Sequence, residues 1–235
     1  VDGSATVAGT VTLDATVANF NAATSTVLGA AQNLVITGDE DVTLGSVTAA
    51  SVNAAASSGI VTMVAAANVT TVTSGSGADD LTLNDAGTVH TLDGGAGNDT
   101  LTTGGGNDTA IGGDGDDTIT TGTGSDSITG GAGNDVINAG SGTDTVDAGA
   151  GTDQIVVTLN DTTSVDGGAG TDRVSAATGT ITSTTAASVS GQFITVSESI
   201  APTLTGVPIL GPFLAGAATM FGTDKGAEIG SQVAK

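Results

Sequence analysis

Apolar residues recur every nine positions in the middle of the chain, each with a polar residue on both sides. Between 94 and 156 these apolar positions hold Leu101, Ala110, Ile119, Ile128, Ile137, Val146 and Ile155. A polar–apolar–polar triplet such as Thr100-Leu101-Thr102 fits a short strand that turns one side chain inward. The pattern therefore predicts one short strand in each nine-residue unit, with the remaining residues forming a turn.

The residues before each predicted strand follow the frame G-G-x-G-x-D-x-U-x, in which U is a bulky aliphatic residue. Seven such units run without a gap from 94 to 156, and two more cover 74–82 and 167–175. All have Gly at the second and fourth positions and Asp at the sixth, and Gly permits a positive φ and close approach of neighbouring chains. Two units make an 18-residue coil, so stacked coils predict an all-β, parallel β-solenoid or β-roll.

The composition narrows the possible functions and the nature of the core. The chain has 25 acidic and three basic residues, which give a formal net charge of −22. Binding to the phosphates of a nucleic acid requires clustered Lys and Arg. Nucleic acid is therefore not an expected partner. The chain has four Phe and no Trp, Tyr or Cys, so we expect a thin aliphatic core without disulfides. Such a composition is also typical of disorder, but a flexible linker has no reason to keep its apolar residues in register.

Stacked coils would place the repeated aspartates in two columns 18 residues apart, Asp99, Asp117, Asp135 and Asp153 in one and Asp108, Asp126 and Asp144 in the other. Carboxylates repeated at this spacing repel each other, and a hard dication that binds six to eight oxygens reverses the repulsion. Ligation by oxygen alone favours Ca²⁺ over zinc or copper. Pairing the units along each edge predicts five ions in 94–156, and the two flanking units raise the number to seven.

The frame resembles the RTX nonapeptide of proteins secreted by Gram-negative bacteria. The resemblance implies a right-handed parallel β-roll with calcium between its turns, and a chain exported by type I secretion to the cell exterior. It also implies that each unit contributes its Asp carboxylate and the carbonyls of its G-x-G-x turn. Carried over residue by residue, the expected metal ligands are Asp79, Gly95, Gly97, Asp99, Gly104, Gly106, Asp108, Gly113, Gly115, Asp117, Gly122, Gly124, Asp126, Gly131, Gly133, Asp135, Gly140, Gly142, Asp144, Gly149, Gly151, Asp153, Gly168, Gly170 and Asp172.

Four regions are predicted along the chain. Residues 1–73 contain β-rich runs every eight to ten residues and are interpreted as metal-free rungs of the same solenoid, with a small β-sandwich as the alternative. Residues 74–175 form the calcium-binding β-roll, and 176–200 add terminal strands. Residues 201–235 are interpreted as a C-terminal cap with a helical turn or two, or as an export or assembly segment.

No active site is expected. His90, the only histidine, has no nucleophile elbow near it and is interpreted as a surface or inter-strand filler. The chain also lacks the H-E-x-x-H and G-x-S-x-G motifs of secreted proteases and lipases.

The composition is rich in Ala, Thr, Val, Gly and Asp and resembles that of RTX-bearing bacterial surface-layer (S-layer) proteins. We therefore expect an extracellular structural protein that folds and assembles into a homo-oligomer or lattice on binding Ca²⁺. A cell-surface polysaccharide is a further expected partner, and no membrane span is expected. Two alternatives stay open: the C-terminal module of a secreted enzyme, and an adhesin or ice-binding repeat that uses outward-facing threonines.

Overall fold

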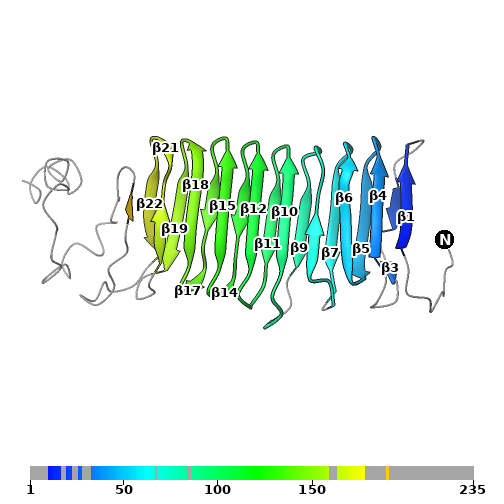
Figure 1. The fold of residues 1–235 in the computed structure, drawn as a ribbon, viewed down its shortest axis with the longest axis horizontal. Helices are drawn as coiled ribbons and strands as arrows, with labels where there is room; N and C mark the ends of the chain where they lie inside the picture. The colour runs from blue at the N-terminus through cyan, green and yellow to red at the C-terminus, as the bar shows by residue number, and fades with distance from the viewer. Residues whose placement is uncertain are drawn as a thin grey trace, which may run out of the picture.

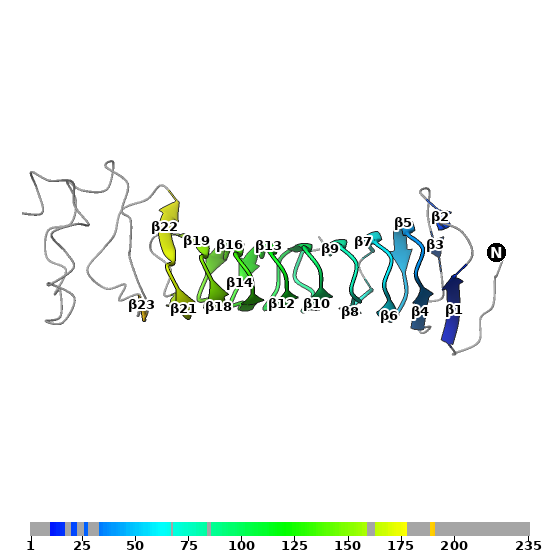
Figure 2. The same ribbon diagram turned by 90° about the horizontal axis from the view of Figure 1, so that it is seen from above.

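The strands wind into a parallel β-solenoid of about eight turns, with no helix among the described residues (Figure 1). The structure is a computed structural model and describes residues 10–16, 20–22, 26–27, 33–66, 68–83, 86–158, 163–177 and 189–190. Two long sheets face each other along the solenoid, as the view from above shows (Figure 2). The predicted all-β solenoid is confirmed, whereas the predicted C-terminal cap at 201–235 lies outside the described residues.

Each coil contributes a strand to both sheets, and all strand pairs are parallel. Sheet A contains, in spatial order, β1 (Thr10–Ala15), β4 (Asn33–Gly38), β6 (Ser51–Ser57), β8 (Thr71–Thr73), β10 (Thr91–Ala96), β12 (Thr109–Asp114), β15 (Ser127–Ala132), β18 (Thr145–Gly151), β20 (Ser164–Asp166) and β23 (Val189–Ser190), with β21 (Ala169–Gly170) beside β18. Sheet B contains β2 (Phe20–Ala22), β5 (Val42–Thr48), β7 (Val61–Ala65), β9 (Asp80–Leu83), β11 (Thr100–Thr103), β13 (Thr118–Thr120), β16 (Val136–Asn138), β19 (Gln154–Thr158) and β22 (Arg173–Ala177), with β3 (Thr26–Val27) beside β5. A small third sheet pairs β14 (Thr123–Gly124) with β17 (Ser141–Gly142) at the turns.

The strand register confirms the 18-residue coil. In sheet B, Thr100 pairs with Thr118, its counterpart one coil later. The flanking units join the same sheet over slightly longer connections, because Thr100 also pairs with Asp80 and Gln154 pairs with Arg173. The longer connections at both ends of the repeat block therefore leave the solenoid unbroken.

The core is a narrow stack of aliphatic side chains between the two sheets. The eighth residue of every repeat unit is buried, and along sheet B these residues are Leu81, Leu101, Ile119, Ile137, Ile155 and Val174. Sheet A contributes Leu92, Ala110, Ile128, Val146 and Val165 to the same stack. Each unit of nine residues thus buries one main apolar side chain, which is little burial for the backbone that it orders.

Upstream of the repeat units the solenoid has a denser apolar core. Strand β4 buries Leu34 and Ile36, and strand β5 buries Val42, Leu44 and Val47. These strands belong to the same two parallel sheets as the repeat units. The boundary at residue 73 between metal-free and metal-binding coils stays a prediction.

Candidate metal centre

Glycines let the turns of successive coils stack in close contact. Gly115 has a φ of +132°, and a Cβ at this position would collide with the carbonyl oxygen of Gly97 in the preceding coil. Of the glycines predicted as ligands, all except Gly104 and Gly122 have a positive φ. Only glycine adopts such conformations at low cost, so the sequence places it where the backbone must turn and stack.

The turns form two edges of the solenoid. The first edge leads from sheet A to sheet B and holds the column Asp79, Asp99, Asp117, Asp135, Asp153 and Asp172. The second edge leads from sheet B to sheet A and holds the column Asp108, Asp126 and Asp144. All nine of these side chains are buried, each with 3% or less of its surface exposed. The structure therefore brings the predicted carboxylates together in the two predicted columns.

One oxygen of each carboxylate is bound to the coil before it. The Oδ1 atom of Asp117 accepts a hydrogen bond from the backbone N–H of Asp99 at 2.8 Å, and Oδ1 of Asp126 accepts one from the N–H of Asp108 at 2.8 Å. The flanking units continue this pattern, since Oδ1 of Asp172 accepts from the N–H of Asp153 at 3.1 Å. Each column is thus a chain of hydrogen bonds along the solenoid axis, and in every carboxylate these bonds occupy Oδ1 and leave Oδ2 for other partners.

The other carboxylate oxygen is buried and has no hydrogen-bond partner in seven of the nine aspartates. These oxygens are the Oδ2 atoms of Asp99, Asp108, Asp117, Asp126, Asp135, Asp153 and Asp172. An ionised oxygen that is buried without a partner is strongly unfavourable. Among the described residues the only Lys or Arg is Arg173, which is exposed. The positive charge that these oxygens require must therefore come from outside the described chain.

The geometry around the first glycine of a unit tests whether a metal ion fits these carboxylates. A Cβ built on Gly94 would lie 2.5 Å from Oδ2 of Asp99 and 2.7 Å from the carbonyl oxygen of Gly112. A carboxylate oxygen from one turn and a carbonyl oxygen from the next therefore lie close to each other beside Gly94, where one ion can share them. The same pair of oxygens meets at Gly112 and at Gly130. A donor set made only of oxygen, with a spread of backbone carbonyls, suits Ca²⁺.

Each turn contributes a single carboxylate to the column. No group of three or more His, Asp or Glu side chains meets in the part of the chain that the structure describes. A bound ion would therefore take most of its oxygens from turn carbonyls, and ligation by individual glycines stays a prediction.

Burial raises the pKa values of the column carboxylates. It raises the pKa of Asp99 to about 7 and the pKa values of Asp117 and Asp153 to about 6, against an ordinary value of 3.8. The backbone N–H that each carboxylate accepts lowers its pKa in part, and neighbouring carboxylates raise it further. Burial also raises the pKa values of Asp126 and Asp135. Desolvation, more than the repulsion invoked from the sequence, is thus the main reason why these groups need a counterion.

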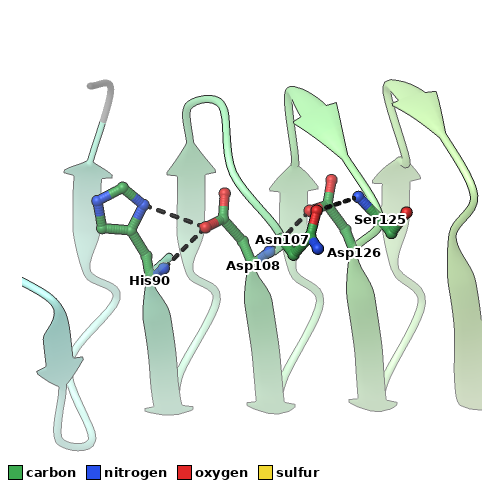
Figure 3. Close-up of polar contacts among 5 residues, drawn as sticks. All are labelled: His90, Asn107, Asp108, Ser125 and Asp126. Atoms are coloured by element: carbon green, nitrogen blue, oxygen red, sulfur yellow. Dashed lines mark hydrogen bonds and ion pairs between the residues drawn. The ribbon is translucent and has the colours of Figure 1, made fainter. Parts of the chain in front are cut away.

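His90 occupies a position in the second column that sequence reasoning missed. Its backbone N–H donates to Oδ1 of Asp108 at 2.8 Å, as the N–H of Asp108 does to Asp126 one coil later (Figure 3). Its ring Nδ1 lies 3.2 Å from the same oxygen of Asp108, and 1% of the residue is exposed. The interpretation of His90 as a surface residue is therefore wrong, whereas the alternative, a residue between strands, agrees with its burial. The signal in the sequence is its spacing, 18 residues before Asp108, in a unit that has lost the rest of the frame.

Comparison with known proteins agrees with this geometry. The family model of the RTX calcium-binding nonapeptide repeat (four copies) matches residues 91–119 and 120–155, nearly the whole uninterrupted block. No curated protein and no solved structure gave a significant match. RTX repeats are typical of secreted proteins and form domains that are typically structural rather than catalytic. Among the described residues no helix is long and apolar enough to cross a membrane. Residues 91–155 of this chain therefore match the RTX calcium-binding nonapeptide repeat and fold as parallel coils of a β-solenoid.

Proposed function

We propose that this protein is an extracellular structural β-roll that binds calcium along both edges and folds as it does so. The seven buried carboxylate oxygens without a hydrogen-bond partner carry this proposal. The position of three of them, in Asp99, Asp117 and Asp135, supports it, because each lies close to a backbone carbonyl oxygen of the following coil. The raised pKa values of Asp99 and Asp117 support it too, because burial makes these carboxyls harder to ionise without a counterion.

Five ions are proposed for the uninterrupted block. Three lie between successive turns of the first edge, from Asp99 to Asp153, and two lie between turns of the second edge, from Asp108 to Asp144. The carboxylates use Oδ2, because Oδ1 is already bound to the preceding coil. A bound ion supplies the positive charge that offsets the desolvated carboxylates and joins one turn to the next.

Calcium binding is proposed to be coupled to folding. The thin aliphatic core and the charged columns do not stabilise the repeat block alone, so binding free energy becomes folding free energy. Extracellular calcium modules bind at about 10⁻⁴–10⁻³ M. Free calcium inside cells lies far below this range, so the chain stays unfolded during export and folds outside.

Assembly into a surface layer or matrix is the next step of the proposal. The composition supports it, and so does the surface of sheet A, where exposed Asp147 and Asp166 are direct neighbours in the strand register. Such surface carboxylates lie outside both columns and are available to bind calcium between copies of the chain.

A calcium titration tests both parts of this proposal. We expect circular dichroism to show a cooperative gain of β-structure at about millimolar Ca²⁺, and size-exclusion chromatography to show large assemblies at the same concentration. Magnesium serves as the control, since it requires near-ideal octahedral geometry and dehydrates reluctantly. Full β-structure in excess chelator would refute the coupling of folding to calcium, and a monomer in excess calcium would refute assembly.

A further inference from the structure

We propose that three side chains, Ser74, His90 and Thr163, close three of the four ends of the described carboxylate columns in place of calcium. This inference rests on the proposed function and deepens it, because it specifies where the row of ions begins and ends. Each of the three contributes a hydrogen-bond donor to a buried column aspartate. Together they would fix the number of divalent ions that the described roll takes up.

Ser74 closes the upstream end of the first column. It is the first residue of its unit, the position that Gly94, Gly112 and Gly130 occupy in later coils of the same edge. In those coils the aspartate Oδ2 beside the glycine has no hydrogen-bond partner, whereas here the Ser74 hydroxyl donates to Oδ2 of Asp79.

The second oxygen of Asp79 is also bound. It accepts the backbone N–H of Val61 at 2.6 Å, and Val61 brings no further carboxylate to the column. Both oxygens of Asp79 are therefore satisfied by the protein, although the turn of Asp99 follows directly.

His90 closes the upstream end of the second column. It stands at the column position one coil before Asp108, and its ring replaces the carboxylate that would face the turn 103–108 (Figure 3). The ring Nδ1 at 3.2 Å from Oδ1 of Asp108 provides a second donor to that oxygen, beside the backbone N–H of His90. A neutral imidazole with its proton on Nδ1 is sufficient for this contact.

Thr163 closes the downstream end of the second column. Its Oγ1 donates to Oδ2 of Asp144 at 3.4 Å, and the N–H of Ser164 bonds to the carbonyl of Asp144, so this segment forms the next coil. Asp79 and Asp144 are the two column aspartates whose Oδ2 atoms are not orphaned. Side-chain donors to Oδ2 thus occur at the upstream end of the first column and at the downstream end of the second, and the other seven column aspartates keep an orphaned Oδ2.

This arrangement sets the number of ions in the described roll at six. The first edge takes four ions, because Oδ2 of Asp99, Asp117, Asp135 and Asp153 is orphaned and each is followed by another acidic turn. The second edge takes two, facing Asp108 and Asp126. A seventh ion between the turns of Asp79 and Asp99, which spacing alone predicts, is excluded by Ser74.

The test is to open a closed end and count the ions. We expect Ser74→Gly to bind one more Ca²⁺ per full-length chain than the wild type, and His90→Asp to do the same on the second edge. Bound calcium is counted by equilibrium dialysis and elemental mass spectrometry in excess Ca²⁺, with circular dichroism to verify the fold. Ser76→Gly is the matched control, because Ser76 is exposed in the same turn, and His90→Asn keeps a donor without adding a carboxylate. Both controls are expected to keep the wild-type count.

A further variant covers the case in which Ser74→Gly does not fold. Ser74→Ala removes the hydroxyl and leaves at this position the residue type that Ala148 has in the unit of Asp153, so it should also bind one more ion. Unchanged ion counts in whichever of Ser74→Gly, Ser74→Ala and His90→Asp fold would overturn the closing role while leaving calcium-dependent folding intact. A wild type that binds no calcium would instead refute the proposed function.

Discussion

Replacing Asp117 with Asn should have opposite effects on the metal-free and the calcium-bound protein. The amide keeps Oδ1, which accepts the N–H of Asp99 at 2.8 Å. Its Nδ2 takes the place of the orphaned Oδ2, beside the carbonyl oxygen of Gly130, to which it can donate. The substitution thus removes a buried charge and keeps the acceptor for the N–H of Asp99, but it also removes an anionic metal ligand.

The raised pKa of Asp117 sets the size of the effect without calcium. Ionising this carboxyl in the folded chain is harder than in the unfolded chain, since burial raises its pKa from 3.8 to about 6. This rise in the pKa corresponds to a destabilisation of at most about 3 kcal/mol, and relaxation and solvent screening reduce it to about 1–2 kcal/mol. Asp117→Asn should therefore stabilise the metal-free fold by about 1–2 kcal/mol at neutral pH. In calcium the lost ligand should weaken binding about tenfold, or about 1.4 kcal/mol.

Circular dichroism measures both effects. In excess chelator, the concentration of trimethylamine-N-oxide that induces β-structure should fall in Asp117→Asn, because this osmolyte favours burial. Without osmolyte, the calcium midpoint should rise. Asp116→Asn is the control, since Asp116 lies exposed in the same turn and its Oδ1 accepts the N–H of Asn134 at 2.7 Å, a contact that an amide retains. A loss of stability in both media would refute the argument that Oδ2 of Asp117 is an uncompensated charge that calcium neutralises.

Three further substitutions or conditions test the same structure. Acidification in chelator should stabilise the metal-free fold, because Asp99, Asp117 and Asp153 have higher pKa values in the folded than in the unfolded chain. The protonated carboxyls contribute fully to the free energy of unfolding below pH 3.8, and this contribution is lost as the pH rises through about 6–7. Circular dichroism against pH measures this, and the calcium midpoint should rise on acidification as protons compete for the carboxylates. Gly115→Ala should prevent calcium-induced folding, because its Cβ meets the carbonyl of Gly97, whereas Gly87→Ala, with a φ of +85° and open space around it, should cost only about 1–2 kcal/mol; calcium titrations compare the two. Ile119→Ala should lower the free energy of unfolding in calcium by about 2–5 kcal/mol, because Ile119 is fully buried, and exposed Thr118→Ala should change it by less than about 0.5 kcal/mol in the same urea titration.

The coil and the two columns follow from the sequence because their signals are local and periodic. An apolar residue and an aspartate repeated every nine positions determine which residues face the core and which reach the edge, as Ile119 and Asp117 show. The stacking distance of a parallel sheet then brings residues 18 apart together without further information.

The ends of the columns could not be predicted in the same way. Ser74 looks like a tolerated variation of the frame, and His90 lies in a unit without the frame, so neither has a motif of its own. Their roles appear only when each coil is traced to the next and the partners of both carboxylate oxygens are known. The sequence also did not show that burial, more than repulsion between carboxylates, raises the pKa values of the column aspartates. The reason is related, because the sequence shows the spacing of these residues but not their exposure.

The hydrogen bonding of the columns explains why calcium binding and folding should be cooperative along the solenoid. Oδ1 of Asp135 is bound to the N–H of Asp117, and the orphaned Oδ2 of Asp135 lies beside the carbonyl of Ala148 in the following coil. One carboxylate therefore contacts three successive coils, and an ion at its Oδ2 requires that all three are in register. Ordering one coil places the next carboxylate on its N–H and aligns the next pair of oxygens. Each bound ion thus lowers the ordering cost of its neighbour, so the ions are expected to bind as a group rather than one by one.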